Sequence, residues 1–318
     1  MGTSVGCLAV IPARGGSKAI PRKNSQLFLG KPLLVWTVEC AKRSQVCDRI
    51  ILSTDDDEMA SLGQEAGAEV LFRRPVDLAT DQAPTAPVVR HALQWLKDRE
   101  GWTPSRVVVL EPTAPARQPW QIDESMTLLE QRGADSVASI SAVPHHYVPQ
   151  KLLRLQPDHT IVGISGTAIR DMIHRRQDLE PCYAFNGLIF GCTSELIWHD
   201  PPTLWGQHVT AYVTDSKYQI DLDQPEDWAA AESRCRQLLN EATYLAALQK
   251  AYGTTQVGLT QQYKTGWRCR CEEDHTLSCG PQLEDCLRRH GRILQGCDQG
   301  ESEMKQQVPG HKDTGGGA

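Results

Sequence analysis

The chain has 318 residues, of which 33 are basic and 39 acidic, and its formal net charge is -6 at pH 7. Domains usually hold roughly 100–200 residues, so this length allows one large domain or two small ones. The mild acidity argues against nucleic acid as a partner, because nucleic-acid binding normally requires a basic patch. The sequence contains no apolar run of about 18 residues, the length that a transmembrane helix needs. With 40% hydrophobic residues, we expect a globular protein that neither binds nucleic acid nor enters a membrane.

The first residues indicate a cellular compartment. The stretch MGTSVGCLAVIPARGG lacks the basic segment of a signal peptide, and its short apolar run is followed by Arg14. Without a signal peptide, the eleven cysteines are expected to be reduced thiols, since structural disulfides belong to oxidising compartments. We therefore predict a cytoplasmic protein.

The first 240 residues alternate between β-rich runs and amphipathic stretches. The β-rich runs predict strands at 7–11, 49–54, 68–72, 106–111, 136–140, 187–191, 209–213 and 219–223. The amphipathic stretches predict helices at 32–44, 56–67, 87–98 and 122–133, one from Pro225, and another at 241–253. Strands separated by helices of this length form βαβ units, so we expect an α/β fold, a three-layer sandwich around a mostly parallel central sheet.

Two segments depart from this alternation. Residues 143–181 combine prolines and histidines with a basic run, and we interpret them as an insertion that caps the sheet or makes a subunit contact. Residues 241–318 are predicted to be a helical extension followed by an irregular tail, which carries five of the eleven cysteines. Their spacing matches no paired CxxC zinc pattern, so a poorly ordered extension is favoured over a metal cluster.

The string IPARGGSKAIPRKN (11–24) directly follows the first predicted strand. Gly15 and Gly16 allow a sharp turn whose amides point outward and form an anion-binding concavity. Four cations surround this turn: Arg14, Lys18, Arg22 and Lys23. Ligands of open α/β sheets bind beyond the carboxyl ends of the strands, where this loop must lie. The combination suits a nucleoside triphosphate, although it is neither a Walker A loop nor a GxGxxG fingerprint, and a solvated basic turn remains the alternative.

The string QIDLDQPEDW (219–228) carries a pair of carboxylates. On a strand, Asp221 and Asp223 would face the same side. Two carboxylates together with substrate phosphates form a typical Mg²⁺ site. Asp223 could instead cap the following helix, with Pro225 in the first turn and Glu226 three residues on. The two roles are compatible, and Asp221 has no such structural explanation.

Six motifs in this order resemble the acylneuraminate cytidylyltransferases, the CMP-sialic acid synthetase family. They are IPARGGSK with PRKN, STDD (53–56), RPVDLATD (74–81), LEPTAP (110–115), FNGLIF (185–190) and IDLDQPED (220–227). The resemblance covers about residues 7–240 and implies the fold of the nucleotide-diphospho-sugar transferases. It also implies that the 2-hydroxyl of a nine-carbon sugar acid attacks the α-phosphate of CTP, and that pyrophosphate leaves.

The resemblance implies roles for individual residues. Arg14, Lys23 and Asp223 match catalytic positions, and Asp221 and Asp223 match the pair that binds Mg²⁺. Matches on the nucleotide side are Gly15, Gly16, Ser17, Asn24, Arg74 and Thr85. Matches in the sugar-acid pocket are Glu111, Arg176 and Asn186, although Arg176 could also form a surface ion pair. The segment 143–181 further suggests a homodimer in which the insertion of one subunit reaches the sugar site of the other.

Two departures concern the sugar, and two other activities remain possible. Many relatives carry glutamine where this chain has Glu111, and tyrosine where it has Phe190, at positions that face the sugar. The acceptor could therefore be N-acylneuraminate, legionaminate, pseudaminate or the deaminated sugar acid. A metal-dependent glycosyltransferase would use an Asp-x-Asp pair to hold a nucleotide sugar, and a nucleotide-binding module would bind CTP without turnover.

Overall fold

The computed structural model describes residues 4–173, 175–252, 258–262, 266–270 and 276–278. The chain divides into two compact units, residues 1–235 and residues 236–318. Among the residues that the structure describes, no helix is both long enough and apolar enough to span a membrane.

A six-stranded sheet with the order β10-β6-β9-β5-β1-β4 forms the centre of the first unit. The bounds of these strands are β1 (Ser4–Pro12), β4 (Arg49–Ser53), β5 (Pro104–Val109), β6 (Ser136–Ala142), β9 (Tyr183–Thr193) and β10 (Val209–Val213). Strand β1 pairs in parallel with β4 and β5, and β6 pairs in parallel with β10. Strand β9 is antiparallel to both β5 and β6. The prediction of a mostly parallel sheet is confirmed.

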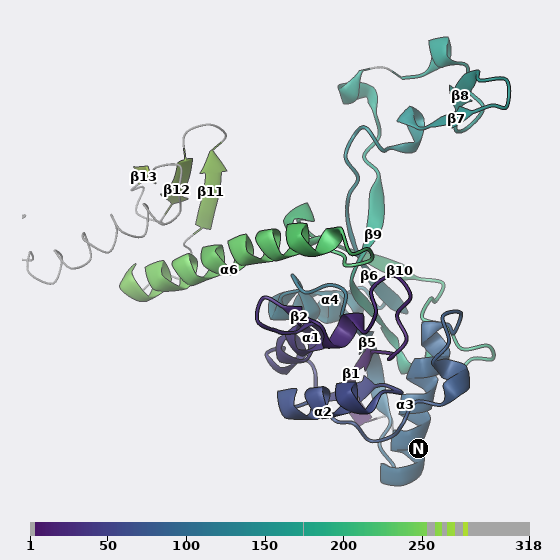
Figure 1. Ribbon diagram of the computed structural model, residues 1–318, viewed down its shortest axis with the longest axis vertical. Coiled ribbons are helices and arrows are strands. Elements are labelled where there is room, and N and C mark those ends of the chain that lie inside the picture. The colour runs from purple at the N-terminus through teal and green to yellow at the C-terminus, as the bar shows by residue number, and fades with distance from the viewer. Residues whose placement is uncertain (1–3, 174, 253–257, 263–265, 271–275, 279–318) are drawn as a thin grey trace, which may run out of the picture. The chain divides into compact units, whose positions relative to one another are not determined.

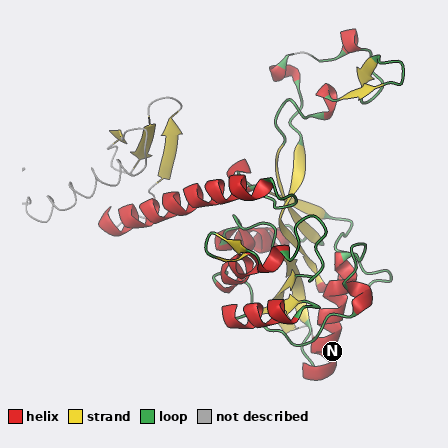
Figure 2. Cartoon of the chain, viewed as in Figure 1, coloured by secondary structure: helices red, strands yellow, loops and turns green. Residues whose placement is uncertain are grey.

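Helices cover both faces of this sheet (Figure 1), and Figure 2 shows them in red on either side of the yellow strands. Helices α1 (Leu33–Lys42), α2 (Asp57–Ala66) and α4 (Pro119–Gln131) pack on one face, and α3 (Thr85–Glu100) and α5 (Ser194–Ile197) pack on the other. Strand β1 contributes alternate side chains to the two cores, Ala9 and Ile11 to the first, Leu8 and Val10 to the second. All four are fully buried, as expected of a strand covered on both faces. The predicted three-layer sandwich is confirmed.

Helix α2 begins beside the candidate site, and the caps at its two ends explain where it starts and stops. The Asp56 side chain accepts a hydrogen bond from the backbone N–H of Met59 at 3.0 Å and so caps the helix. Gly67 closes the helix with a φ of 100°, a left-handed conformation that glycine adopts without strain. The helix predicted at 56–67 is confirmed.

The strand predicted at 68–72 is wrong. Within this segment the structure shows a single β-bridge to the sheet, the isolated parallel bridge between Glu69 and Ile51. The chain then leaves the sheet edge, and the backbone N–H of Arg74 donates to the Thr54 carbonyl at 2.8 Å. The segment therefore leads into the site instead of extending the sheet.

The strand predicted at 219–223 is also wrong, because these residues form a loop. The backbone N–H of Ile220 donates to the Tyr218 carbonyl at 2.9 Å. Ile220 and Leu222 are buried, whereas Asp221 and Asp223 are exposed. These residues do alternate between buried and exposed positions, as in a strand. Among the described residues, however, no strand pairs with them.

A single helix, α6 (Asp227–Tyr252), follows this loop, where two helices were predicted. The Asp227 carboxylate accepts hydrogen bonds from the backbone N–H groups of Asp223, at 3.2 Å, and Gln224, at 2.8 Å. Asp223 lies four residues before the helix, so the interpretation of Asp223 as its N-cap is wrong. The Asp223 carboxylate therefore does not cap α6 and can have another role.

Short elements complete the described chain. The 3-10 turns are η1 (Lys23–Ser25), η2 (Val76–Leu78), η3 (Pro149–Lys151), η4 (Ile169–Asp171), η5 (Arg176–Asp178) and η6 (Ser216–Tyr218). Strands β2 (Leu27–Phe28) and β3 (Lys31–Pro32) form one hairpin, and β7 (Leu153–Leu155) and β8 (Ile161–Gly163) form another inside the insertion.

The second unit contains a small antiparallel sheet, which differs from the irregular tail that was predicted. Its order is β11-β12-β13, with β11 (Gly258–Gln262), β12 (Gly266–Arg270) and β13 (Thr276–Ser278). Four of the five tail cysteines, Cys271, Cys279, Cys286 and Cys297, lie outside the described residues.

Candidate active site

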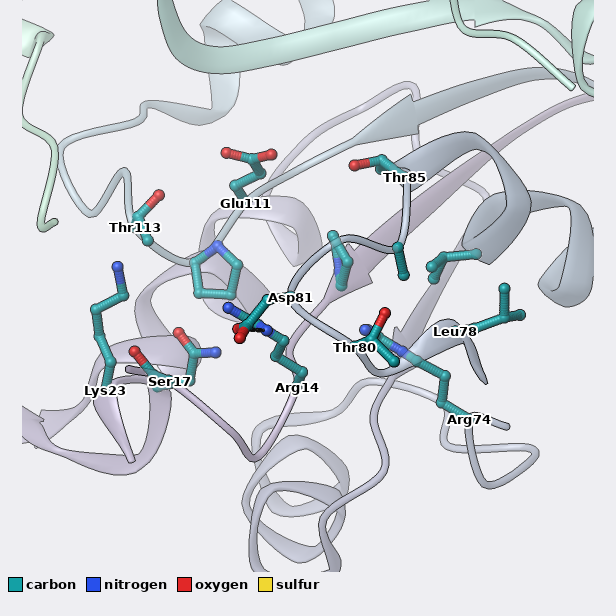
Figure 3. A pocket seen from close by; sticks show the side chains of 15 residues that line it. Arg14, Ser17, Lys23, Arg74, Leu78, Thr80, Asp81, Thr85, Glu111 and Thr113 are labelled. Carbon is teal, nitrogen blue, oxygen red and sulfur yellow. Dashed lines mark hydrogen bonds and ion pairs between the residues drawn. The ribbon is translucent and has the colours of Figure 1, made fainter. Parts of the chain in front are cut away.

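A cavity of about 240 Å³ opens where β1 and β5 end. Seven predicted site residues line it: Arg14, Ser17, Lys23, Asn24, Arg74, Thr85 and Glu111. Figure 3 shows their side chains arriving from the loop after β1, from the segment 74–85 and from the turn after β5. This is the carboxyl-terminal edge of the parallel strands, where α/β sheets bind their ligands.

The glycine turn after β1 is fixed against the end of β4. The backbone N–H of Gly15 donates to Asp55 Oδ1 at 2.9 Å, and a Cβ on Gly15 would lie 3.0 Å from the Cβ of Asp56. Gly15 therefore permits a close approach to the start of α2. The Gly15 amide thus faces an anion, but this anion is the Asp55 carboxylate of the chain itself, so the N–H is not available to a phosphate in this structure. Neither Gly15 nor Gly16 lines the cavity.

The four cations of this loop point in different directions. Arg14 and Lys18 both pair with Asp81, the second at 2.5 Å. These contacts, that of Lys18 first, hold the pKa of Asp81 below its ordinary value. Arg22, with a φ of 54°, pairs instead with Glu58 on α2 and does not line the cavity. Of the four cations of this loop, Arg14 and Lys23 line the cavity.

Lys23 joins the loop after β1 to the acidic pair two hundred residues later in the chain. Its Nζ donates to the Leu222 carbonyl at 2.5 Å and lies 3.4 Å from Asp223 Oδ1. The Lys23 side chain is only 12% exposed, so this contact is held in a partly desolvated place. The two motifs that the sequence separates thus meet at one edge of the cavity.

The carboxylates of Asp221 and Asp223 lie close enough to repel each other and Glu111. Partial desolvation first, and then the charge of Asp223, raise the pKa of Asp221, while a hydrogen bond from Thr113 opposes this. Burial raises the pKa of Glu111, and the charges of Asp221 and Asp223 add to that effect. A cation bound here would relieve the repulsion between these carboxylates.

Two largely buried polar residues line the same cavity. Arg74 is 5% exposed, and its Nε donates to Ser53 Oγ at 3.1 Å; burial lowers the pKa of its guanidinium to about 10. Asn24 is 8% exposed, and its Oδ1 has no hydrogen-bond partner in the described part of the chain. Buried acceptors are normally satisfied, so Asn24 offers an acceptor to a ligand.

A second cavity of about 350 Å³ adjoins the first and shares Thr85 and Glu111 with it. Its remaining lining residues are Pro84, Ala86, Phe190, Pro202, Thr203, Leu204 and Trp205. The rings of Phe190 and Trp205 meet edge to face, with centroids 5.8 Å apart. The sequence reasoning singled out Phe190 but missed Trp205, which belongs to the loop before β10 and to none of the six motifs.

The chain was compared with protein families and curated proteins. Residues 8–150 match the family model described as Cytidylyltransferase. The chain is 32% identical to the CMP-N,N'-diacetyllegionaminic acid synthase of Legionella pneumophila, over 71% of this chain and 94% of that protein. The chain belongs to the cytidylyltransferase family. The resemblance inferred from the six motifs is confirmed.

Other relatives of this chain carry different sugar acids in their names. It is 30% identical to the pseudaminic acid cytidylyltransferase of Campylobacter jejuni, over 69% of this chain and 92% of that protein. It is 31% identical to the N-acylneuraminate cytidylyltransferase of Streptococcus agalactiae serotype V, over 70% of this chain and 51% of that protein. The chain therefore spans about half the length of the N-acylneuraminate enzymes that it matches.

Two solved structures share the fold of this family member. A CMP:2-keto-3-deoxy-manno-octonic acid synthetase complexed with CTP aligns with a TM-score of 0.53 and 14% identity, over 74% of this chain and 99% of that one. The 4-diphosphocytidyl-2C-methyl-D-erythritol synthase of Anaerococcus prevotii aligns with a TM-score of 0.51 and 12% identity, over 73% of this chain and 96% of that one. Both confirm the predicted nucleotide-transferase type of α/β sandwich.

Two residues that were predicted to contact a sugar acid, Asn186 and Arg176, do not line the two cavities described above. Asn186 on β9 is 5% exposed, and its amide donates to Thr214 Oγ1 at 2.6 Å. Arg176 is exposed on η5, where its charge helps to lower the pKa of His145. Neither residue lines either cavity of the described chain. Of the three predicted sugar-pocket residues, only Glu111 does.

Arg117 is a buried residue that sequence reasoning missed. It is 2% exposed, and its guanidinium binds the Glu111 carbonyl at 2.7 Å, the Thr37 hydroxyl at 3.2 Å and the Leu188 carbonyl at 2.5 Å. It therefore ties the turn after β5 to β9 and to α1. A charged residue is normally expected at the surface, so the sequence around Arg117 does not predict that its side chain is buried and links three elements.

Proposed function

We propose that the protein is a cytidylyltransferase for nonulosonic acids, which converts CTP and N-acylneuraminate into CMP-N-acylneuraminate and pyrophosphate. The observation that carries the proposal is the contact of Lys23 with Leu222 and Asp223. It places the loop that carries the carboxylate pair against Lys23, which lines the first cavity, and a metal-bound nucleoside triphosphate requires cations and carboxylates close together. The names of the relatives support the same class of reaction.

In this proposal CTP occupies the first cavity. Arg14 and Lys23 face its phosphates and offset the charge that develops on the departing pyrophosphate. Arg14 and Lys18 already hold one anion, the Asp81 carboxylate, and a phosphate oxygen could take its place. Asn24 and Arg74 line the same cavity and contact the rest of the nucleotide.

The carboxylate pair fits a Mg²⁺ ion. Asp221 and Asp223 supply oxygen donors; partial burial first, and then the charge of Asp223, raise the pKa of Asp221, and a cation would relieve the repulsion between the two carboxylates. Within the described residues no group of three or more His, Cys, Asp or Glu side chains could hold a metal. Two carboxylates completed by substrate phosphates and water match the preference of Mg²⁺. When bound, Mg²⁺ would neutralise phosphate charge and lower the pKa of the attacking hydroxyl.

The sugar acid occupies the second cavity, which shares Glu111 and Thr85 with the first. From there its 2-hydroxyl oxygen forms a bond to the α-phosphorus of CTP. The bond from that phosphorus to the bridging oxygen breaks, pyrophosphate leaves with the electron pair, and the proton of the hydroxyl is released to the solvent. Positioning two substrates side by side supplies much of the acceleration in such a reaction.

A pyrophosphate-release assay tests this function. CTP is combined with N-acetylneuraminate, legionaminate, pseudaminate and the deaminated sugar acid, each with and without Mg²⁺. We expect pyrophosphate with at least one acid, only in the presence of Mg²⁺, and none when ATP replaces CTP. A glycosyltransferase would instead liberate nucleotide from a preformed donor, and CTP binding without turnover over the whole panel would indicate a binding module.

The proposal includes a homodimer. The insertion exposes six large apolar side chains, Leu152, Leu153, Leu155, Ile161, Ile164 and Ile173. Exposed apolar surface is typical of subunit contacts, and Arg176, on the same insertion, lines neither of the two cavities described above. Light scattering at micromolar concentration is expected to give twice the mass of one chain, and Leu155→Glu with Ile161→Glu to give a monomer. A monomeric wild-type protein would contradict this part of the proposal.

A further inference from the structure

Glu111 is one of the two residues that line both cavities. Its backbone carbonyl accepts a hydrogen bond from Arg117 at 2.7 Å. Its carboxylate, however, receives no hydrogen bond or ion pair in the part of the chain that the structure describes. A partly buried carboxylate without donors is costly, and polar groups in such places are normally satisfied. Figure 3 shows this carboxylate directed away from the side chain of Arg14.

The second cavity supplies Glu111 with no positive charge. Its other polar lining residues are Thr85 and Thr203, and no lysine or arginine is among the described residues that line it. An acidic group placed there would be repelled by Glu111. The cations Arg14 and Lys23 lie in the first cavity. A sugar acid must therefore enter the second cavity with its uncharged face toward Glu111.

We propose that Glu111 determines acceptor specificity by accepting a hydrogen bond from one hydroxyl or N–H group of the sugar acid. This inference rests on the proposed function and names the chemical feature that its acceptor must carry. Acids with a donor at that position are selected, and acids that present a carbonyl, a fluorine or a second carboxylate there are rejected.

The chemistry of the side chain explains the selection. An ionised carboxylate only accepts hydrogen bonds, whereas a glutamine amide both donates and accepts. Glutamine at this position would therefore tolerate donors and acceptors alike. Arg117 holds the backbone carbonyl of Glu111. Because the backbone is fixed, the carboxylate can contact only one position of the sugar.

The test is a coupling experiment between enzyme and substrate. The preferred acid and a set of analogues, each lacking one hydroxyl or bearing fluorine in its place, are assayed with wild-type enzyme, Glu111→Ala and Glu111→Gln. We expect one deoxy analogue to lower kcat/KM by about 10- to 100-fold in the wild type, the worth of a hydrogen bond to a charged group. The same analogue should change kcat/KM by less than about 3-fold in Glu111→Ala, where the acceptor is gone.

Glutamine has nearly the same shape as glutamate, so Glu111→Gln tests the inference even if Glu111→Ala fails to fold. The fluoro analogue at the position that Glu111 contacts is expected to be at least about 10-fold better with Glu111→Gln than with wild type, because the substitution removes the repulsion between the carboxylate and the fluorine. Glu65→Gln removes the same charge from an exposed position on α2 and should leave every ratio unchanged.

Two outcomes overturn the inference. Equal penalties in the wild type and both variants for every analogue would show that Glu111 reads no group of the sugar, while the proposed function would stand. A wild-type enzyme that releases no pyrophosphate with any acid would overturn the proposed function, and this inference with it.

Discussion

Asp221→Asn is expected to lower Mg²⁺-dependent turnover about 1,000-fold, the scale of removing one preorganised charge from a phosphoryl-transfer site. Asparagine keeps the size of the side chain but removes the charge that would bind the metal. The substitution also removes the repulsion from Asp223 that raises the pKa of Asp221. The metal-free variant should therefore be at least as stable to thermal unfolding as the wild type. Pyrophosphate release over a range of Mg²⁺ concentrations, with melting curves, measures both effects.

The matched control is Asp98→Asn on α3, where the carboxylate accepts a hydrogen bond from Gln94 at 2.7 Å that an asparagine oxygen can also accept. This variant removes one acidic charge outside both cavities and should keep wild-type turnover and melting temperature. Full Mg²⁺-dependent activity of Asp221→Asn would remove Asp221 from the mechanism. A lowered melting temperature would instead show that its charge stabilises the fold.

The parts of the site that sequence reasoning placed correctly depend on short local strings. Arg14, Ser17, Lys23 and Asn24 follow one buried strand within about a dozen residues, and the rule that ligands bind at the carboxyl ends of parallel strands locates all four. The strand itself is recognisable because residues 7–11 are all apolar and fully buried, as expected when both faces are covered.

The errors arise where tertiary partners decide the outcome. The segment 219–223 alternates buried and exposed residues like a strand, yet no strand lies beside it, so it remains a loop. The amide of Gly15 is free in the sequence pattern, but in the fold Asp55 on the loop after β4 occupies it. Local patterns do not contain these partners.

The second cavity could not be predicted for a related reason. Thr203, Leu204 and Trp205 come from a loop with no motif, and they meet Glu111 and Thr85 only because β9 is inserted between β5 and β6. An antiparallel strand in an otherwise parallel sheet changes which loops share an edge. The alternating pattern of strands and helices predicts the sheet but not this strand order.

Arg117→Met is expected to destabilise the protein by about 3 kcal/mol. The substitution leaves the buried carbonyls of Leu188 and Glu111 without their donor, at about 1–3 kcal/mol each. It also removes a buried charge, whose desolvation lowers the pKa of Arg117 to about 10, and this partly offsets the loss. Arg117→Lys should be nearly as destabilising, because a single ammonium cannot reach three acceptors that the planar guanidinium binds together.

Chemical denaturation of both variants and of Arg99→Met measures this effect. Arg99 is exposed near the end of α3, and its replacement should change the free energy of unfolding by no more than about 0.5 kcal/mol. Because Arg117 holds the carbonyl of Glu111, the folded fraction of Arg117→Lys should also lose part of its discrimination between the sugar acid and its deoxy analogue. Unfolding midpoints equal to that of the wild type would show that water or neighbouring side chains satisfy the carbonyls, and that the turn after β5 keeps its shape without the guanidinium.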